Sequence, residues 1–141
     1  MTTPLRLLVL CTGNSARSQL AEALFRAEGG AVVEVESAGS DPKPEIHPMA
    51  RRVARETLGL TLDGQFPKAV DRFTRERFDV VITVCDGAAE RCPVFPGAPV
   101  RIHWSLPDPA AASGSEEEVH RAFEEVARDL RERIRAFLAA G

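Results

Sequence analysis

The segment Leu5 to Leu10, LRLLVL, constrains the fold most, because it is a short and mostly apolar run that stops at the turn-forming stretch CTGNSARS. A run of this length between turn residues is typical of a strand buried on both faces of a parallel sheet. From Arg17 to about Glu28 the apolar residues recur at helical spacing, and Gly29 and Gly30 supply a stop. The sequence therefore predicts a strand that passes through a short loop directly into a helix.

The same alternation of strands and helices continues along the chain. Ala31 to Glu36, Phe78 to Val84 and Pro99 to Trp104 are predicted as three further strands. Strands that alternate with helices imply a parallel sheet with right-handed crossovers. We expect an α/β fold, a three-layer sandwich around a four-stranded parallel sheet, formed as a single domain by residues 1–141. In such sheets, ligands bind at the carboxyl ends of the strands.

The remaining helices differ in how clearly the sequence marks them. A helix is predicted from about Met49 to Leu58, and residues 60–77 are predicted as a loop with a short helix. The last helix is long, and Ser115 and Glu118 form a capping box at its start. Its apolar stripe consists of Val119, Phe123, Val126, Leu130, Ile134 and Phe137.

Composition limits the classes of partner. A chain of 141 residues with 44% hydrophobic residues can form one ordinary core. A net charge of -3 provides no broad basic field, so we expect neither a nucleic acid nor a membrane as partner. The first ten residues, MTTPLRLLVL, are too short an apolar run for a signal peptide or a membrane span. We therefore expect a cytoplasmic protein, and its balanced composition is compatible with a monomer.

The three cysteines point to thiol chemistry. An odd number of cysteines without an export signal argues against a secreted disulfide framework. A structural zinc site needs four ligands, often with close cysteine pairs, and the three histidines are scattered. We expect no metal and no cofactor, and we assign His47, His103, His120 and Trp104 to packing or to the surface.

The loop that follows the first strand has the composition of an oxyanion site. Cys11 is followed six positions later by Arg17, and no acidic residue lies between them. Small residues let the backbone curl so that its N–H groups point inward, and the following helix adds the positive end of its dipole. The predicted oxyanion-binding residues are Thr12, Gly13, Asn14, Ser15, Ala16, Arg17 and Ser18.

A second segment has the same spacing of cysteine and arginine. Cys85 and Arg91 are also six positions apart, but Asp86 and Glu90 lie between them and would repel an anion. Pro93 follows where a helix should begin. Spacing alone therefore does not select the oxyanion loop, whereas charge and the following helix do.

Cys11 is the predicted nucleophile. Inward amides, the helix N-terminus and the Ser18 hydroxyl all stabilise a thiolate, so we expect a lowered pKa. Arg17 can hold two oxygens of a tetrahedral anion with its planar guanidinium. Asp108, in a proline-flanked loop after the fourth predicted strand, is the candidate acid for the leaving oxygen. The alternatives are a buried structural cysteine at position 11 and an aspartate at position 108 that only starts a turn.

Cys85 and Cys92 admit two interpretations. They are either inert core cysteines or the second and third members of a thiol relay. In thiol–disulfide exchange a second cysteine can resolve a covalent adduct on the first, and a third can carry the disulfide outward.

Three motifs together, CTGNSARS, VCDGAAERCP and HWSLPDPA, resemble those of the thioredoxin-coupled arsenate reductases, which share the fold of the low-molecular-weight protein tyrosine phosphatases. The resemblance covers essentially the whole chain. It implies that Cys11 attacks arsenate with Asp108 as acid, that Cys85 then attacks Cys11 and releases arsenite, and that Cys92 attacks Cys85. Thioredoxin would reduce the resulting Cys85–Cys92 disulfide. Phosphate and sulfate would compete with arsenate.

The chain departs from the family pattern at two places. Ala16 stands where some members have an extra cysteine. Some members also bind potassium through residues equivalent to Asn14, Glu22, Ser37 and an aspartate, but Lys68 stands at the aspartate position. The resemblance therefore implies no specific potassium requirement, because an ammonium could replace the ion.

Two other functions remain open from the sequence. A low-molecular-weight phosphatase would use the same loop, nucleophile and acid, but it would leave Cys85 and Cys92 without a role. Such phosphatases usually follow the Asp-Pro pair with aromatic residues, whereas Ala110 to Ala112 follow it here. A weak phosphatase side activity is expected from the shared transition-state geometry. A non-enzymatic oxyanion or redox sensor is the third possibility, and no additional binding segment favours it.

Overall fold

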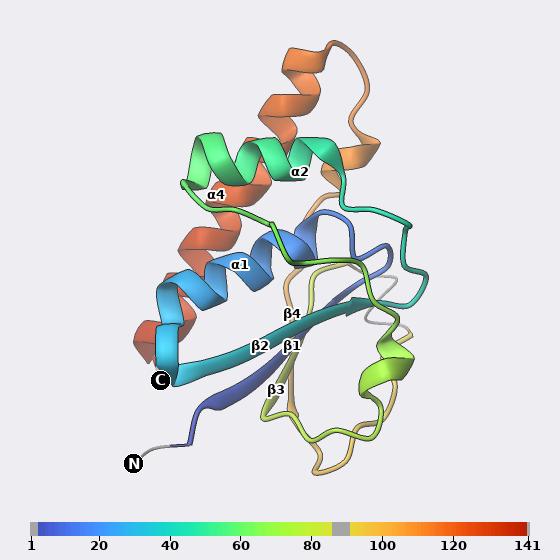
Figure 1. The fold of residues 1–141 in the computed structure, drawn as a ribbon, viewed down its shortest axis with the longest axis vertical. Coiled ribbons are helices and arrows are strands. Elements are labelled where there is room, and N and C mark those ends of the chain that lie inside the picture. The colour runs from blue at the N-terminus through green and yellow to red at the C-terminus, as the bar shows by residue number, and fades with distance from the viewer. Residues whose placement is uncertain (1–2, 86–90, 141) are drawn as a thin grey trace.

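The computed structural model describes residues 3–85 and 91–140, and its centre is a parallel sheet (Figure 1). The strands are β1 (Leu5–Cys11), β2 (Val33–Gly39), β3 (Val80–Thr83) and β4 (Val100–His103), in the spatial order β2-β1-β3-β4. All three strand pairs are parallel. The predicted α/β fold with four parallel strands is confirmed.

The helices gather around the strands. They are α1 (Arg17–Gly29), α2 (Pro48–Val53) with a π-helical continuation (Ala54–Leu58), and α4 (Glu116–Ala140). Short 3-10 turns span Gly30–Val32, Val70–Phe73 and Pro109–Ala111. Helices α1, α2 and α4 pack against one another, on the same side of the strands in Figure 1. Among the described residues, none of the helices is apolar over a stretch long enough to cross a membrane.

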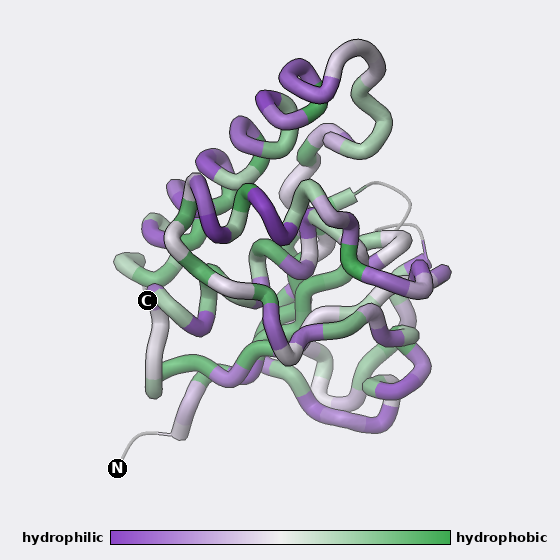
Figure 2. Tube along the Cα trace, turned by 45° about the horizontal axis from the view of Figure 1, so that its top comes forward, coloured by the Kyte–Doolittle hydropathy of each residue, from purple (hydrophilic) through white to green (hydrophobic). Residues whose placement is uncertain are grey.

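Strand β1 is buried on both faces, as its apolar run predicts. Leu7, Leu8 and Val9 have no exposed surface. Figure 2 shows hydrophobic residues along the strands, whereas hydrophilic and hydrophobic residues alternate along α4. In the register of the sheet, Cys11 lies opposite Gly39 and Leu10 opposite Thr83. The sheet thus places the ends of β1, β2 and β3 at one edge.

Two observed strands differ from the predicted ones in their bounds: β2 begins two residues later and ends three residues later than predicted, and β3 is shorter. Residues 31 and 32, predicted as strand, belong to the 3-10 turn that Gly30 enters with a φ of 53°, and Val32 is 65% exposed. Strand β3 covers only the middle of the predicted Phe78 to Val84, although the Val84 N–H still donates to the Leu10 carbonyl. The predicted cap of the last helix is present, because Ser115 Oγ accepts a hydrogen bond from the Glu118 N–H at 3.2 Å.

The stripe of α4 provides a test of the core. Phe123 has no exposed surface and its ring lies 4.8 Å from that of His47. Replacing Phe123 by alanine should lower the free energy of unfolding by about 3–5 kcal/mol, because the cavity left behind cannot fully close. Denaturant titration measures this value, with the exposed Val32→Ala as control at about 0.5 kcal/mol or less. Equal effects of both substitutions would contradict the assigned core.

Candidate active site

The segment CTGNSARS connects the end of β1 to the start of α1. Cys11 is the last residue of the strand and is buried, and Arg17 is the first residue of the helix. The loop therefore lies at the carboxyl edge of the sheet, where parallel α/β folds bind their ligands.

The loop carbonyls all point away from the loop. The carbonyl oxygens of residues 11–15 each accept a hydrogen bond from outside the loop backbone. Their donors, in order, are the N–H groups of Ser40, Asp41 and Lys43, the side-chain amide of Gln19, and the N–H group of His47, at 2.8–3.3 Å. Because a trans peptide places its N–H opposite its carbonyl, the loop N–H groups face inward. The described residues contain no cis peptide bond. The result is an anion nest above Cys11.

Gly39 makes this arrangement possible, although its role is not evident from the sequence. A Cβ atom at this position would lie 2.4 Å from the Thr12 carbonyl oxygen. Only a glycine lets the end of β2 approach the loop so closely. The chain that follows Gly39 can then donate its N–H groups to the loop. In the sequence, Gly39 is only a small residue at the end of a strand, and such residues are also common in strands that do not contribute to a functional site.

Asn14 holds the shape of the loop. Its φ of 48° lies in the left-handed region, which asparagine tolerates better than most residues. Its side-chain amide donates to Ser18 Oγ at 2.7 Å and to Ser37 Oγ at 3.0 Å, while its Oδ1 accepts from the Lys68 N–H at 2.8 Å. Gly13, by contrast, is not in the left-handed region, and its lack of a side chain leaves room for Lys43.

The sulfur of Cys11 lies at the floor of the nest. It is 2.8 Å from Ser18 Oγ, and the Asn14 N–H donates to it at 3.1 Å. Burial raises the pKa of the Cys11 thiol, and the hydrogen bonds from Ser18 and Asn14 and the charge of Arg17 lower this pKa by less. The expected lowered pKa is therefore wrong for this structure, because the donors do not outweigh the complete burial of the sulfur.

Arg17 and Asp108 meet beside the loop. Arg17 Nη1 donates to the Leu106 carbonyl at 2.9 Å, which fixes the guanidinium next to the chain after β4. Asp108 Oδ1 lies 3.9 Å from Arg17 Nη2, and the Asp108 side chain is 50% exposed. The same oxygen accepts a hydrogen bond from the Ala110 N–H. Asp108 thus starts a turn and also lies beside Arg17 at the candidate site, and its role as the acid stays a prediction.

The two other cysteines occupy different places. Cys85 follows β3 and its sulfur lies 3.3 Å from Thr12 Oγ1, which brings it to the oxyanion loop. Cys92 lies beside β4, where Arg101 Nη1 donates to its sulfur at 2.7 Å. Cys11, Cys85 and Cys92 are not joined by a disulfide. The acids of the second cysteine–arginine segment, within residues 86–90, lie outside the described residues.

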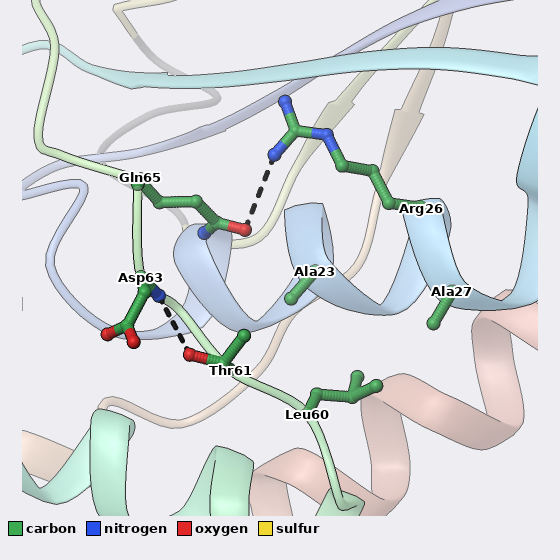
Figure 3. Close-up of a pocket in the computed structure, with 8 residues that line it drawn as sticks. Ala23, Arg26, Ala27, Leu60, Thr61, Asp63 and Gln65 are labelled. Atoms are coloured by element: carbon green, nitrogen blue, oxygen red, sulfur yellow. Dashed lines mark hydrogen bonds between the residues drawn. The ribbon is translucent and has the colours of Figure 1, made fainter.

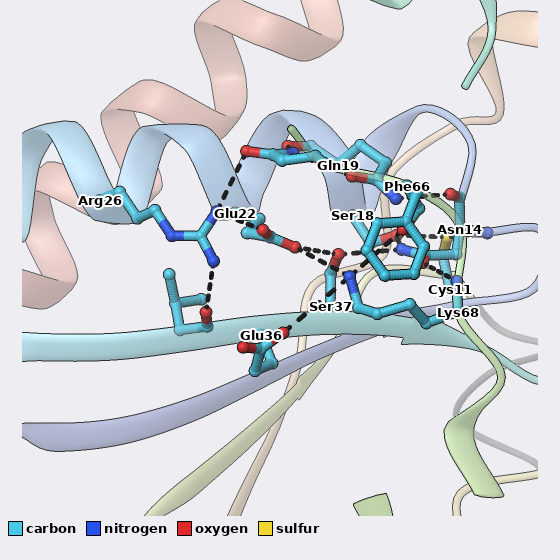
Figure 4. Close-up of polar contacts among 12 residues, drawn as sticks. Cys11, Asn14, Ser18, Gln19, Glu22, Arg26, Glu36, Ser37, Phe66 and Lys68 are labelled. Atoms are coloured by element: carbon cyan, nitrogen blue, oxygen red, sulfur yellow. Dashed lines mark hydrogen bonds and ion pairs between the residues drawn. The ribbon is translucent and has the colours of Figure 1, made fainter. Parts of the chain in front are cut away.

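A buried cluster of charges lies beneath the loop (Figure 4). The carboxylate of Glu22, only 2% exposed, accepts a hydrogen bond from Ser37 Oγ at 2.5 Å and pairs with Arg26. The Lys68 ammonium, 5% exposed, lies 3.6 Å from Glu22 Oε1 and 3.9 Å from Glu36 Oε2. Glu22 therefore has two cationic partners already. Glu22 and its neighbours do not fit a bound potassium ion, because the Lys68 ammonium already supplies the positive charge beside the Glu22 carboxylate.

An open hollow on the surface adjoins this cluster at Arg26. It measures about 450 Å³ and lies between α1 and residues 60–65 (Figure 3). Its lining contains none of the predicted site residues. Within residues 3–85 and 91–140, no cluster of histidine, cysteine, aspartate and glutamate is suited to a metal ion.

The fold and the site define an α/β protein with a buried cysteine thiol inside an oxyanion-binding loop. The model of the family "Low molecular weight phosphotyrosine protein phosphatase" matches residues 6–140, and the chain belongs to this family.

Three similar proteins represent the relatives. An arsenate reductase of Bacillus licheniformis is 39% identical over 132 residues, which cover 94% of both chains. The solved structure of a thioredoxin-dependent arsenate reductase of Corynebacterium glutamicum is 32% identical, with a TM-score of 0.65, and the match covers 96% of this chain and 65% of that one. A low molecular weight protein tyrosine phosphatase of T. tengcongensis has a TM-score of 0.79 over 97% of this chain and 99% of that one. At 19% identity this last match shows the fold alone.

The Ser18 hydroxyl gives a prediction about the nucleophile. Removing it in Ser18→Ala removes a contact that lowers the pKa of Cys11, so the pH midpoint of Cys11 alkylation should rise by about one unit. Because the thiolate is the reactive form, alkylation at a fixed pH near 8 should slow accordingly. Iodoacetamide labelling followed by peptide mass analysis measures this, with the exposed Ser113→Ala as control. An unchanged midpoint would show that Ser18 does not act on the sulfur.

The Lys68 ammonium gives a prediction about monovalent cations. At equal ionic strength, the melting temperature and the affinity for sulfate should be the same in potassium and in sodium, because the cationic place beside Glu22 is taken. Thermal unfolding and calorimetric titration measure both quantities. A clear gain in either with potassium would mean that an ion binds despite Lys68.

Proposed function

We propose that the protein is an arsenate reductase that works through a relay of three cysteines. The observation that carries the proposal is the contact between Cys85 and Thr12, which places a second thiol at the oxyanion loop that already contains Cys11. The similarity to the arsenate reductase of B. licheniformis, which extends over nearly the whole chain, supports it.

The first step joins Cys11 to arsenic. The inward N–H groups of residues 12–16 and the Arg17 guanidinium bind the tetrahedral anion, and the Cys11 sulfur attacks the arsenic atom. A sulfur–arsenic bond forms and an arsenic–oxygen bond breaks, and the departing oxygen leaves as water. The thiol of Cys11 supplies one of the two protons of this water and monohydrogen arsenate the other, so a raised pKa of Cys11 is compatible with the reaction. Asp108, beside Arg17, is positioned to pass a proton to the leaving oxygen.

The second step transfers electrons. The Cys85 thiolate attacks the sulfur of Cys11, and the sulfur–arsenic bond breaks with its electron pair remaining on arsenic. Arsenic is reduced from the pentavalent to the trivalent state and leaves as arsenite, while two thiols are oxidised to the Cys11–Cys85 disulfide. Thr12 holds the Cys85 sulfur next to the loop for this attack.

The third step moves the disulfide away from the loop. Cys92 attacks Cys85, which restores the Cys11 thiol and leaves a Cys85–Cys92 disulfide. A dithiol reductant is then required, and we propose thioredoxin. The dependence on thioredoxin in the name of the C. glutamicum relative supports this choice.

The phosphatase alternative explains less of the site. It uses Cys11, Arg17 and Asp108 but gives no role to the Cys85 thiol beside Thr12. The hollow at Asp108 is lined by alanines, prolines, Val126 and the acidic residues Glu125 and Asp129, and among the described residues it contains no aromatic side chain. A phosphate ester can still enter the loop, so slow phosphatase activity is compatible with the main proposal.

Two variants separate the steps. With thioredoxin, thioredoxin reductase and NADPH, the Cys92→Ser protein should release about one equivalent of arsenite and then stop, because the Cys11–Cys85 disulfide is not resolved. Cys85→Ser should release none. Arsenite measured against time by a chromatographic assay distinguishes them, with the exposed Ser113→Ala as control. Full multiple turnover by either cysteine variant would overturn the relay, and turnover of phosphate esters alone would favour the phosphatase.

A further inference from the structure

Cys92 is held by one arginine of the edge strand. Cys92 lines a small hollow of about 150 Å³ against β3 and β4, together with Val81, Thr83, Arg101, Ile102 and His103. Arg101 Nη1 donates to the Cys92 sulfur at 2.7 Å, and Nη2 of the same guanidinium donates to the Pro93 carbonyl at 2.8 Å. The two planar N–H groups therefore fix both the side chain and the backbone at this cysteine.

This contact does not favour both redox states of the cysteine equally. A thiol, and even more a thiolate, is a better acceptor for a charged N–H donor than a disulfide sulfur, which cannot carry a negative charge. The contact with Arg101 thus stabilises Cys92 in its reduced form. An interaction that favours the two thiols over their disulfide makes the disulfide more easily reduced.

We propose that Arg101 is a positioning residue that shifts the redox equilibrium of the Cys85–Cys92 pair toward the two thiols. The proposal rests on the relay proposed above, in which this pair carries the final disulfide. Arg101 would then favour the transfer of that disulfide to a dithiol reductant. Because Arg101 is largely exposed, its effect should be a few-fold change and not a change of several orders of magnitude.

A redox titration tests the role of Arg101. In a Cys11→Ser background, the protein is equilibrated with mixtures of reduced and oxidised dithiothreitol. Forming the Cys85–Cys92 disulfide then passes two electrons and two protons to oxidised dithiothreitol, which becomes the dithiol. The disulfide fraction, measured by quenched alkylation and mass analysis, gives the equilibrium constant. Arg101→Gln should favour the disulfide about fivefold, equivalent to about 20 mV.

Two further variants control this measurement. Arg101→Lys keeps the charge but loses the planar pair of donors, so its shift should be smaller than that of Arg101→Gln. Arg91→Gln removes the same charge next to Cys92 in sequence, but among the described residues no hydrogen bond joins Arg91 to that sulfur, so it should cause no shift. An equilibrium constant that is unchanged in Arg101→Gln, or that moves toward the thiols, would overturn the role of Arg101 alone. If no Cys85–Cys92 disulfide formed at any ratio, both the relay and the role of Arg101 would fail.

Discussion

The site depends on the hydrogen bonds that the loop carbonyls accept from the chain after β2. Four of the five carbonyls from Cys11 to Ser15 accept backbone N–H groups of residues 40–47, and Gln19 satisfies the fifth. Each of these bonds turns a peptide so that its own N–H faces the nest. The close approach at Gly39 permits the whole set, because the Thr12 carbonyl leaves no room for a side chain there. Oxyanion binding is thus a property of the packing between two crossovers of the sheet, and the loop sequence alone does not provide it.

A buried carboxylate connects this loop to the rest of the protein. Glu22 lies on α1 and is buried. Removing its carboxylate from water costs free energy that cationic partners must offset. Lys68 and Arg26 provide the positive charge. Ser37 donates a hydrogen bond to Glu22 and accepts one from the Asn14 side-chain amide. The same amide donates to Ser18, beside the Cys11 sulfur. The Lys68 N–H also binds Asn14 directly. One continuous set of contacts therefore joins the charged residues beside the loop to the Cys11 sulfur.

Local patterns predicted the strongly periodic parts of this structure. The buried run of β1, the helix after the loop and the capped α4 were predicted because each depends on neighbouring residues. The start of β2 was predicted too early, because a positive φ at Gly30 forms a turn where the valines suggest a strand. The resemblance of the motifs, and not their spacing, favours a relay over two inert core cysteines, and the relay stays a prediction.

The features that sequence did not reveal are long-range ones. The pKa of Cys11 was predicted in the wrong direction, because its burial results from the packing of the whole sheet edge. The N–H donors of residues 40–47 act through the backbone and have no side-chain signature. The contact of Arg101 with Cys92 joins an edge strand to a loop and likewise has no local signal.

A single turnover of the unmodified protein shows whether arsenate reduction passes a disulfide from Cys11 through Cys85 to Cys92. The fully reduced protein is mixed with a limiting amount of arsenate in the absence of thioredoxin, quenched by alkylation, and analysed for arsenite and for disulfide-linked peptides. A three-cysteine relay should lose two thiols for each arsenite formed, and the disulfide should join Cys85 to Cys92. Arsenite formed without loss of thiols, or a final disulfide that still includes Cys11, would contradict it.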